Sequence, residues 1–345
     1  MTTVDTARPA GEVLDSCRVR VEPALRAAVD ALPSSMQRIV GYHLGWWEED
    51  GRPTGAAGGK AIRPALTLLS AATVGGTADS AIPAAVAVEL VHNFSLLHDD
   101  VMDRDLTRRH RPTAWAVFGT GPAILAGDSL LALAMDVLAA SGHPAAERGT
   151  RMLSAAVQDL VNGQIADLAF EQRTDVGLSE CLDMAGNKTG ALLGCASAVG
   201  ALFGNGGFDE VGAMERFGRE LGVAFQIVDD LLGIWGDPVA TGKAADTDLR
   251  CRKKTLPVVA ALTSGTPAGR ELDELYHREQ ELSDAELARA AELVELAGGR
   301  AWCHDRVGDL MVEALRRLPV AATPTASEAV AELGTLAQLI ARRDH

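Results

Sequence analysis

Long apolar runs with helical spacing alternate along this chain with short polar segments that contain Gly or Pro. Apolar residues recur every three to four positions, which is the spacing of one helix face, and strand-like alternation is nearly absent. Gly and Pro mark where the runs stop. The pattern predicts helices over residues 15–31, 34–49, 61–75, 80–103, 112–140, 144–172, 178–203, 208–234, 254–263, 268–279, 283–297, 299–318 and 325–343.

Some of these runs are apolar on nearly every side, as in Ala191 to Leu202. A helix of that kind belongs in the centre of a bundle. Residues 1–12 are rich in Thr, Pro and Gly and are expected to form a disordered tail. With no internal repeat or linker, the rest of the chain, residues 13–345, is predicted to be one large all-α domain.

Composition narrows the classes of function and location. The chain has 345 residues, 47% of them hydrophobic and 4% aromatic, and a net charge of −15. That charge argues against a nucleic-acid partner or an anionic membrane surface. We find no signal-like N-terminus and no charge-free apolar run of about 20 residues, which predicts a cytoplasmic protein without stable membrane insertion. The five scattered cysteines lack CxxC spacing, so they predict neither a disulfide framework nor a zinc site.

The candidate chemistry begins in the stretch from Glu89 to Pro112, where carboxylates and then cations follow an apolar helical run. On a helix Asp99 and Asp103 share a face one turn apart, with about 6 Å between their Cβ atoms. Both carboxylates can therefore reach ions in front of that face.

A second acidic pair, Asp229 and Asp230, closes the apolar run from Phe225 to Asp237. Acidic pairs that faced each other without counter-ions would repel, and divalent cations remove that repulsion. Carboxylate oxygens without Cys or His suit Mg²⁺, which keeps much of its water shell and shares its other positions with phosphate oxygens. The sequence therefore predicts magnesium together with a diphosphate.

These motifs occur in an order that resembles a known family. DDVMD at residues 99–103 is followed by RR and PT, and FQIVDD lies at residues 225–230. This set is similar to the two aspartate-rich motifs of the trans-isoprenyl diphosphate synthases, which include farnesyl and geranylgeranyl diphosphate synthases. The resemblance runs from about Lys60 to Pro257. It implies an all-α bundle of the isoprenoid synthase type with a central active-site cavity, usually a homodimer.

The activity implied is a Mg²⁺-dependent condensation of isopentenyl diphosphate with allylic diphosphates. The allylic diphosphate ionises, isopentenyl diphosphate attacks the carbocation, and a proton is lost, giving a C20 (geranylgeranyl) or C15 (farnesyl) diphosphate. The resemblance implies three Mg²⁺ ions once substrate is bound. The implied metal ligands are Asp99, Asp103 and Asp229, and the carboxylates implied to act through metal-bound water are Asp100, Asp167 and Asp230.

Two groups of residues are implied to bind the two diphosphates. Those that match the isopentenyl diphosphate site are Lys60, Arg63, His92 and Arg109. Those that match the allylic site are Arg108, Lys188, Thr189, Gln226, Lys243 and Lys253. The set implied to carry the ionisation step is Asp99, Asp103, Arg108, Lys188, Asp229 and Lys253. Arginine suits such sites because its planar fork binds phosphate oxygens bidentately and keeps its charge.

The chain departs from the family pattern at three positions. Ala61 stands where the family often has Arg, and His110 stands where it usually has Gly after the two arginines. Gly233 replaces the last carboxylate of the second motif. We expect a weaker third ion there rather than an inactive site, because that last carboxylate acts largely through water.

Product length is predicted from the residues before the first motif. Phe94 and Ser95 lie five and four positions before Asp99, and no insertion separates Asp100 from Asp103. An aromatic at the fifth position with a small residue at the fourth resembles the C20 branch. The alternative is that Phe94 only packs in the core and another helix sets the floor of the cavity.

Other functions fit these residues less well. Glu89-x-x-His92 and Glu274-x-x-His277 resemble the pairs of a di-iron bundle, but that leaves the Asp, Arg and Lys set unexplained. The segment ending at Gly242-Lys243 lacks the spacing and the Ser or Thr of a phosphate loop. A class I terpene cyclase has no use for a second diphosphate pocket. Loss of the first motif would indicate a regulatory subunit of a heteromeric synthase. That motif is intact in this chain.

Overall fold

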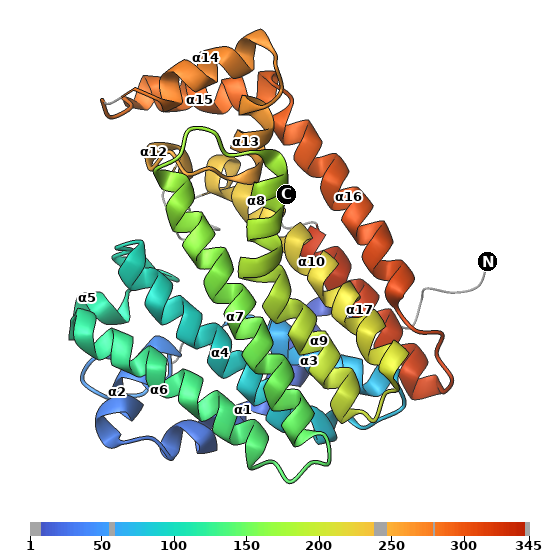
Figure 1. Cartoon of the computed structure of the whole chain (residues 1–345). Coiled ribbons are helices and arrows are strands. Elements are labelled where there is room, and N and C mark those ends of the chain that lie inside the picture. Colours follow the sequence, from blue (N-terminus) through green and yellow to red (C-terminus); the bar gives the residue numbers. More distant parts are fainter. Residues whose placement is uncertain (1–7, 55–58, 238–246, 279, 342–345) are drawn as a thin grey trace. The chain divides into compact units, whose positions relative to one another are not determined.

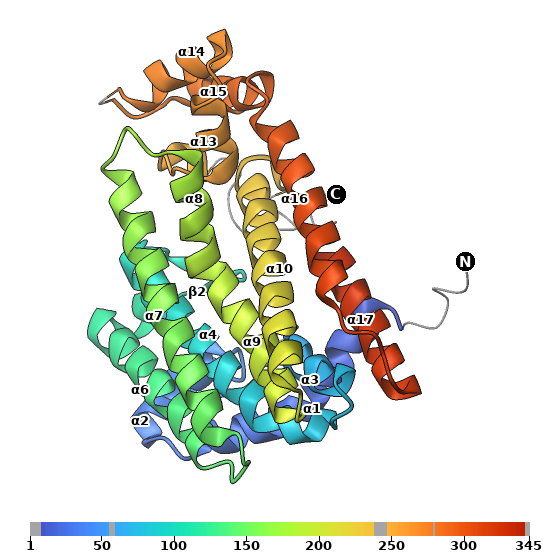
Figure 2. The same ribbon diagram turned by 45° about the vertical axis from the view of Figure 1, so that its right-hand side comes forward.

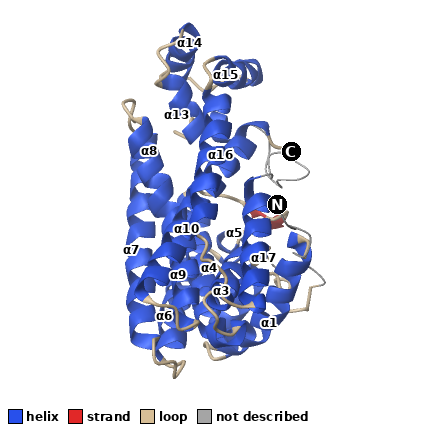
Figure 3. Cartoon of the chain, turned by 90° about the vertical axis from the view of Figure 1, so that its right-hand side faces the viewer, coloured by secondary structure: helices blue, strands red, loops and turns tan. Residues whose placement is uncertain are grey.

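A computed structural model describes residues 8–54, 59–237, 247–278 and 280–341. Nearly all the regular structure in these ranges is helical, and the named strands, β1 (Thr107–Arg108) and β2 (Arg111–Pro112), have two residues each. Figure 3 shows this dominance of helix. The predicted all-α class is confirmed.

The chain forms two compact units, each assembled from separate stretches. Unit 1 contains residues 1–157, 192–218 and 317–336, and unit 2 contains residues 158–191, 219–316 and 337–345. Each of the five boundaries falls inside a helix, and these helices are α7 (Ala146–Glu171), α9 (Ala191–Phe203), α10 (Phe208–Trp235), α16 (Gly299–Arg317) and α17 (Pro324–Ala341). The single domain expected from the sequence stays a prediction.

Unit 1 is organised around α4 (Ile82–Met102), whose buried residues lie on most of its faces. It packs against α6 (Thr120–Ala139), α3 (Ile62–Thr73) and α1 (Ala10–Asp30), as Figure 1 shows. Glycine brings α9 (Ala191–Phe203) close to α3, because a Cβ at Gly200 would lie 2.2 Å from the Thr67 carbonyl oxygen. The remaining elements are α2 (Ser34–His43), η1 (Ala78–Ala81) and α5 (Ala114–Phe118).

The N-terminal end of the described chain meets α17 in unit 1. The Arg8 Nε atom donates a 2.6 Å hydrogen bond to Oε1 of Glu332, whose side chain is only 3% exposed. Burial of a carboxylate is costly unless a charge or hydrogen bond compensates it. The α17 helix is therefore joined to the N-terminal segment by an ion pair as well as by apolar packing.

Unit 2 has its own apolar core, formed where α13 (Leu256–Leu262), α14 (Pro267–Tyr276) and α15 (Asp284–Leu296) pack together (Figure 2). Its other elements are α8 (Leu178–Ala185), the π-helical segment η2 (Gly186–Gly190), α12 (Thr247–Arg250) and nearly all of α16 (Gly299–Arg317). Parts of α7 and α10 complete it.

The observed elements differ from the predicted ones at backbone positions with unusual geometry. Gly45 has φ +79°, and α2 ends at His43 instead of running to residue 49. Gly119 has φ +93° and separates α5 from α6, which the sequence predicted as one helix. The α1 helix begins at Ala10, so the predicted tail to residue 12 is too long.

Two helical stretches are apolar and long enough to cross a membrane by length and composition alone, Ala78–Met102 and Thr120–Ala139. Core helices often share these properties, and 67% of the apolar window of the first is buried. The second is only 33% buried, and its Ile124 and Leu125 are 37% and 58% exposed. The α6 helix thus carries an apolar face that unit 1 leaves uncovered.

Candidate active site

The first acidic motif forms the C-terminal turn of α4. The Asp103 N–H donates to the Asp99 carbonyl oxygen at 2.8 Å, which places the two residues one helical turn apart as predicted. Asp103 is exposed and Asp99 is half-buried, whereas the Asp100 side chain is buried. Neighbouring carboxylates of one motif therefore have different surroundings.

Arg108 holds the buried carboxylate of Asp100. Its Nε and Nη2 atoms each lie 2.7 Å from the same oxygen, Asp100 Oδ1. Hydrogen bonds in which both partners are charged are short and strong. Asp100 therefore fixes the direction of the Arg108 guanidinium.

Arg108 belongs to a tight hairpin that the sequence reasoning missed. Arg108 pairs with Arg111, which leaves Arg109 and His110 as a two-residue turn with φ values of +51° and +61°. Two-residue hairpin turns favour positive φ at both positions, where Gly or Asn is preferred. His110 stands in the conformation that suits the glycine of the family pattern, and its backbone is strained there.

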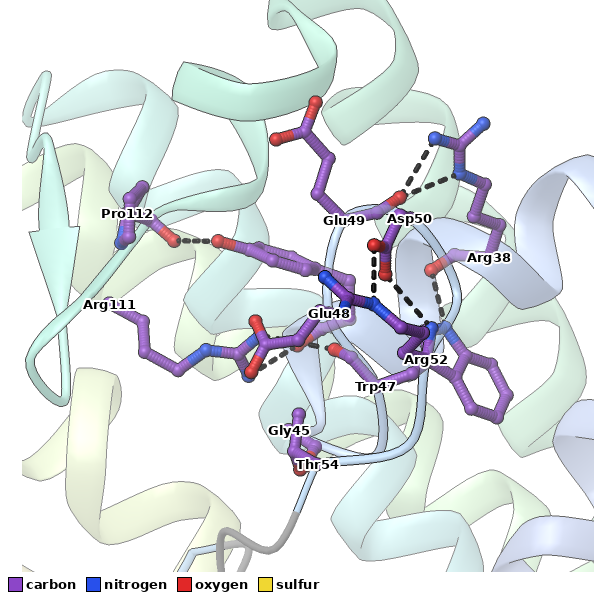
Figure 4. Close-up of polar contacts among 11 residues, drawn as sticks. Arg38, Gly45, Trp47, Glu48, Glu49, Asp50, Arg52, Thr54, Arg111 and Pro112 are labelled. Carbon is purple, nitrogen blue, oxygen red and sulfur yellow. Dashed lines mark hydrogen bonds and ion pairs between the residues drawn. The ribbon is translucent and has the colours of Figure 1, made fainter.

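Arg111 fastens this hairpin to the segment that follows α2 (Figure 4). Its guanidinium donates to the carbonyl oxygens of Tyr42 and Trp47 at 3.3 and 3.0 Å, and to Glu48 Oε2 at 3.1 Å. It also lies 4.5 Å from the centre of the Tyr42 ring. The Tyr42 hydroxyl in turn donates to the Pro112 carbonyl oxygen at 2.9 Å. Contacts from both sides thus hold the strained turn.

The residues matched to the acceptor diphosphate gather near the hairpin. A Cβ at Gly59 would lie 2.8 Å from Nη2 of Arg109, so the glycine segment passes directly against that guanidinium. Burial, followed by the charges of Arg63 and Arg109, holds the pKa of His92 well below its usual value. Lys60 is exposed just before α3, where Ala61 has φ +53°. Unit 1 therefore concentrates positive charge at this point.

A cavity of about 80 Å³ lies beside the hairpin. Its charged or titratable lining residues come from α2, α4 and the hairpin, and they are Tyr42, His43, Asp100, Arg108, Arg109 and Arg111. Such a lining suits an anion, because the arginines outnumber the single carboxylate.

In unit 2 one carboxylate is shared by two lysines. Oδ2 of Asp167 lies 2.6 Å from the Lys188 ammonium nitrogen and 3.6 Å from that of Lys253. Burial alone would raise the pKa of Asp167, but the two lysine charges hold it below its usual value. All three residues were predicted site residues, and unit 2 brings them together.

The second acidic motif also divides into an exposed and a buried carboxylate. Asp229 is exposed, whereas Asp230 is buried and accepts hydrogen bonds from the Leu256 N–H and from Gln226 Nε2 at 2.9 and 2.7 Å. Burial raises the pKa of Asp230 to about 7. The Thr189 hydroxyl donates to Gln226 Oε1 at 2.6 Å, which joins the KT motif to the second acidic motif.

Close backbone packing explains the glycine of the GQ pair. A Cβ at Gly163 would lie 2.3 Å from the Lys188 backbone nitrogen, so only glycine allows α7 to approach η2 this closely. The adjacent Gln164 is buried, and neither of its amide atoms has a hydrogen-bond partner among the residues that the structure describes. Leaving a buried polar group without a partner costs about 1–3 kcal/mol.

The space beside Gly233 holds a carboxylate from another element. An ideal Cβ at Gly233 would lie 2.0 Å from Oδ2 of Asp248, which sits on α12. The charge of Asp248 also contributes to the raised pKa of Asp230, after burial as the largest cause. A negative group thus stands near the position where the family pattern has its last carboxylate, and the sequence reasoning did not name it.

Magnesium was predicted from the chemistry of these carboxylates. Within the described ranges, no three residues of the types His, Cys, Asp and Glu are grouped closely enough to hold an ion by themselves. Two carboxylates one turn apart still match Mg²⁺, because this ion keeps several waters and binds few protein ligands together with phosphate oxygens. The donors at the end of α4 therefore fit that ion.

Two of the remaining predicted residues are buried in unit 1. Phe94 is buried and packs edge to face on His98, with ring centres 4.8 Å apart. Ser95 is also buried, and its hydroxyl donates to the His92 carbonyl oxygen at 2.8 Å. Lys243 lies outside the described residues. The role of Phe94 and Ser95 in product length stays a prediction.

Comparison with known proteins gives a consistent family. The polyprenyl synthetase family profile matches residues 50–294. A Mycobacterium tuberculosis protein named (2E,6E)-farnesyl diphosphate synthase is 51% identical over 84% of this chain and 82% of its own. A second protein of that organism, named geranylgeranyl diphosphate synthase, is 44% identical over 96% of this chain and 93% of its own. The crystal structure of a polyprenyl synthetase from Streptomyces coelicolor A3(2) has a TM-score of 0.90, 46% identity and coverage of 95% and 98%.

Proposed function

The chain belongs to the polyprenyl synthetase family, and from this premise we propose that it is a prenyltransferase whose main product is geranylgeranyl diphosphate. Family membership makes it a trans-prenyltransferase of the C15 and C20 class, using isopentenyl diphosphate and an allylic diphosphate. Its relatives carry both product names, so similarity alone does not choose between the two lengths. The small Ser95 together with the aromatic Phe94 supports C20.

The observation that carries the proposal is the cationic cluster of unit 1. The charges of Arg63 and Arg109 both act on His92, and the glycine segment before Lys60 passes against Arg109. A cyclase ionises one diphosphate and does not bind a second one. A separate cluster of this size therefore supports an enzyme that also holds an acceptor diphosphate.

In the reaction we propose, the carbon–oxygen bond of the allylic diphosphate breaks and its electron pair stays on the departing diphosphate. The double bond of isopentenyl diphosphate then attacks the allylic cation, and loss of a proton restores a double bond. Arg108, held by Asp100, and the lysines shared by Asp167 stabilise the charge that develops on the leaving group. Such interactions accelerate the reaction because they are stronger in the transition state than in the ground state.

Members of this family are generally magnesium-dependent. We propose Asp99, Asp103 and Asp229 as ligands of three Mg²⁺ ions, with Asp100, Asp167 and Asp230 acting through water. Bound Mg²⁺ neutralises diphosphate charge and so assists departure of the leaving group. Asp100 is engaged in an ion pair and Asp230 accepts hydrogen bonds from the protein. These contacts support an indirect role in metal binding for the two carboxylates.

One assay tests the activity and its product. Purified protein is incubated with isopentenyl diphosphate and each allylic starter, with Mg²⁺ or with excess chelator, and the products are separated by chromatography. We expect a Mg²⁺-dependent C20 product. A cyclic hydrocarbon from an allylic diphosphate alone would favour the cyclase instead.

Two variants refine the product assignment. Phe94→Ala should shift products beyond C20, and Ser95→Phe should shorten them toward C15. Unchanged products from both would leave the prenyltransferase in place and move the floor of the cavity to another helix.

We also propose that the enzyme is a cytoplasmic homodimer. The uncovered apolar face of α6, which includes Ile124 and Leu125, supports an interface between copies, because large exposed apolar patches mark interaction sites. Light scattering after size exclusion measures the mass of the particle. Leu125→Glu should weaken the dimer, and Asp136→Glu, an exposed change on the same helix, should leave it intact.

A further inference from the structure

His43, the last residue of α2, contacts the anion-suited cavity but was not named by the sequence motifs. Its Nε2 atom is buried and has no hydrogen-bond partner among the residues that the structure describes. A buried polar atom without a partner is costly, so its retention beside two arginines calls for a ligand.

The other nitrogen of the ring is fixed by a polar chain from α4. Asn93 Nδ2 donates to the carbonyl oxygen and to Oε1 of Glu89, at 2.8 and 3.2 Å, which uses both amide protons. The remaining atom, Asn93 Oδ1, can only accept, and His43 is hydrogen-bonded to Asn93. Because Nε2 has no partner, the Nδ1–H group of His43 is the donor in that bond. The neutral ring therefore presents a lone pair at Nε2.

The surroundings keep this ring neutral. Burial, and then the charges of Arg108 and Arg109, lower the pKa of His43 to about 3, and Asn93 opposes the shift. The other charged or titratable groups of the neighbourhood are Tyr42 on α2, Arg63 on α3, Glu89, His92 and Asp100 on α4, and Arg111 in the hairpin with its partner Glu48. Positive groups outnumber negative ones around His43. The binding of an anion would therefore make the electrostatic potential at this ring less positive.

We propose that His43 binds the acceptor diphosphate through Nε2 and takes up one proton when that diphosphate arrives. The inference rests on the proposed function, because it deepens the acceptor site of the same enzyme. A fully ionised phosphate oxygen can only accept hydrogen bonds, and Nε2 can donate only when the ring is protonated. The proton comes from solvent, and it returns to solvent when the ligand leaves. His43 is thus a binding residue, while Asn93 and Glu89 are positioning residues.

The same chemistry could serve free inorganic diphosphate as well as isopentenyl diphosphate. Calorimetry with each ligand alone separates the two, because neither reacts without an allylic partner. Titration in two buffers with different heats of ionisation gives the number of protons taken up on binding. If isopentenyl diphosphate and inorganic diphosphate give equal affinity and equal uptake, the apolar tail adds nothing and the site is a general diphosphate site, which contradicts the acceptor assignment.

Two substitutions at one position make the test specific. His43→Gln keeps a neutral N–H donor, so it should retain affinity within about threefold while proton uptake falls by about one relative to the wild type. His43→Leu removes the donor and should weaken binding about tenfold or more. KM for the allylic substrate should change less than twofold in both. His143→Gln, a half-buried histidine stacked on Phe203 in the same unit, serves as the matched control.

The outcomes separate this inference from the activity itself. If the wild type binds isopentenyl diphosphate without proton uptake, or if His43→Gln takes up as many protons as the wild type, His43 is not the group that is protonated. If both variants weaken binding of both substrates equally, His43 has only a structural role. If the wild type does not bind isopentenyl diphosphate at all, the proposed function fails first.

Discussion

The two acidic motifs stand in units that arrange their cations differently. In unit 1 Arg108 is paired with Asp100, and the charges of Arg108 and Arg109 act on two imidazoles, those of His92 and His43, and lower the pKa of both rings. In unit 2 Lys188 and Lys253 share the single carboxylate of Asp167, whose pKa they hold below its usual value. Unit 1 thus places arginines beside neutral rings, whereas unit 2 places two lysines on one carboxylate.

The two arrangements match two roles for the same ligand group. A diphosphate that remains attached throughout the reaction needs cations that stay in place. A diphosphate that must leave gains most from cations whose partners can be shared as its charge grows. On the proposed function, Arg63 and Arg109 of unit 1 serve the acceptor, and the two lysines of unit 2 serve the leaving group.

Removal of a metal-facing carboxylate should have the largest effect. Asp99→Ala should lower kcat at least about a thousandfold, because leaving-group departure loses an ion that stabilises its charge. The fold should persist, as measured by circular dichroism. Asp136→Ala, an exposed change on α6, is the control, and full activity of Asp99→Ala would refute the metal assignment.

Loss of the shared carboxylate should release the two lysines of unit 2. Asp167→Asn should lower kcat by about 10–100-fold with little change in KM for isopentenyl diphosphate, since it no longer holds the two lysines in place.

Arg63→Ala should instead raise KM for isopentenyl diphosphate about tenfold or more, with little change in KM for the allylic substrate. Steady-state kinetics with each substrate varied measures both, and equal effects on both KM values would remove the contrast.

Asp167 also predicts an acid dependence of stability. The pKa of Asp167 is lower in the folded protein than in the unfolded chain. Its contribution to the free energy of unfolding is therefore present above the unfolded pKa and is lost as the pH falls through the folded pKa. The wild type should therefore lose more stability on acidification than Asp167→Asn. Urea midpoints at neutral and acidic pH measure the difference, and parallel curves would contradict it.

A swap tests the carboxylate of Asp248. Gly233→Asp alone should destabilise the protein by about 1–3 kcal/mol, because its Cβ meets the Asp248 carboxylate. Gly233→Asp combined with Asp248→Gly should recover most of that loss, which a double-mutant cycle measures by thermal unfolding. Additive effects of the two changes would show that the two positions are independent.

The smallest effect is expected at the hairpin of unit 1. His110→Gly should stabilise the protein by about 1 kcal/mol, because glycine adopts positive φ without the Cβ penalty. Turnover should stay within about twofold, since Arg111 and the Tyr42 hydroxyl still anchor the turn. A fall in unfolding temperature would show that the imidazole contributes more than its backbone costs.

The helices were predictable from the sequence where the chain carries periodic apolar runs. The α4 and α10 helices were predicted to within a few residues, and the motif order indicated the family, which the family profile confirms. The hairpin was missed because Arg109 and His110 adopt positive φ, which residue propensities do not indicate. The π-helical turn at Lys188 was not predicted, and Gly163, which packs against it, is distant from it in the sequence.

The site residues that were missed depend on contacts between distant segments. Arg111 is one more basic residue in a basic stretch, and only its three acceptors near Tyr42 reveal its role. His43 ends an ordinary amphipathic helix, and Asp248 is one of several acids in a polar loop. A histidine at the end of a helix, two residues before Gly45, was the only available signal, and it is too common to identify a site.

The ion pair between Arg8 and Glu332 has a consequence for synthesis in the cell. Unit 1 takes its last helical stretch from α17, so its N-terminal helices leave the ribosome long before their final partner exists. At about 5–20 residues per second, the wait is roughly 10–40 s. During that time apolar surface destined for the core stays open to other chains, which makes the nascent protein a client for chaperones. Slower translation of the middle of the message should therefore lower soluble yield without changing the finished enzyme.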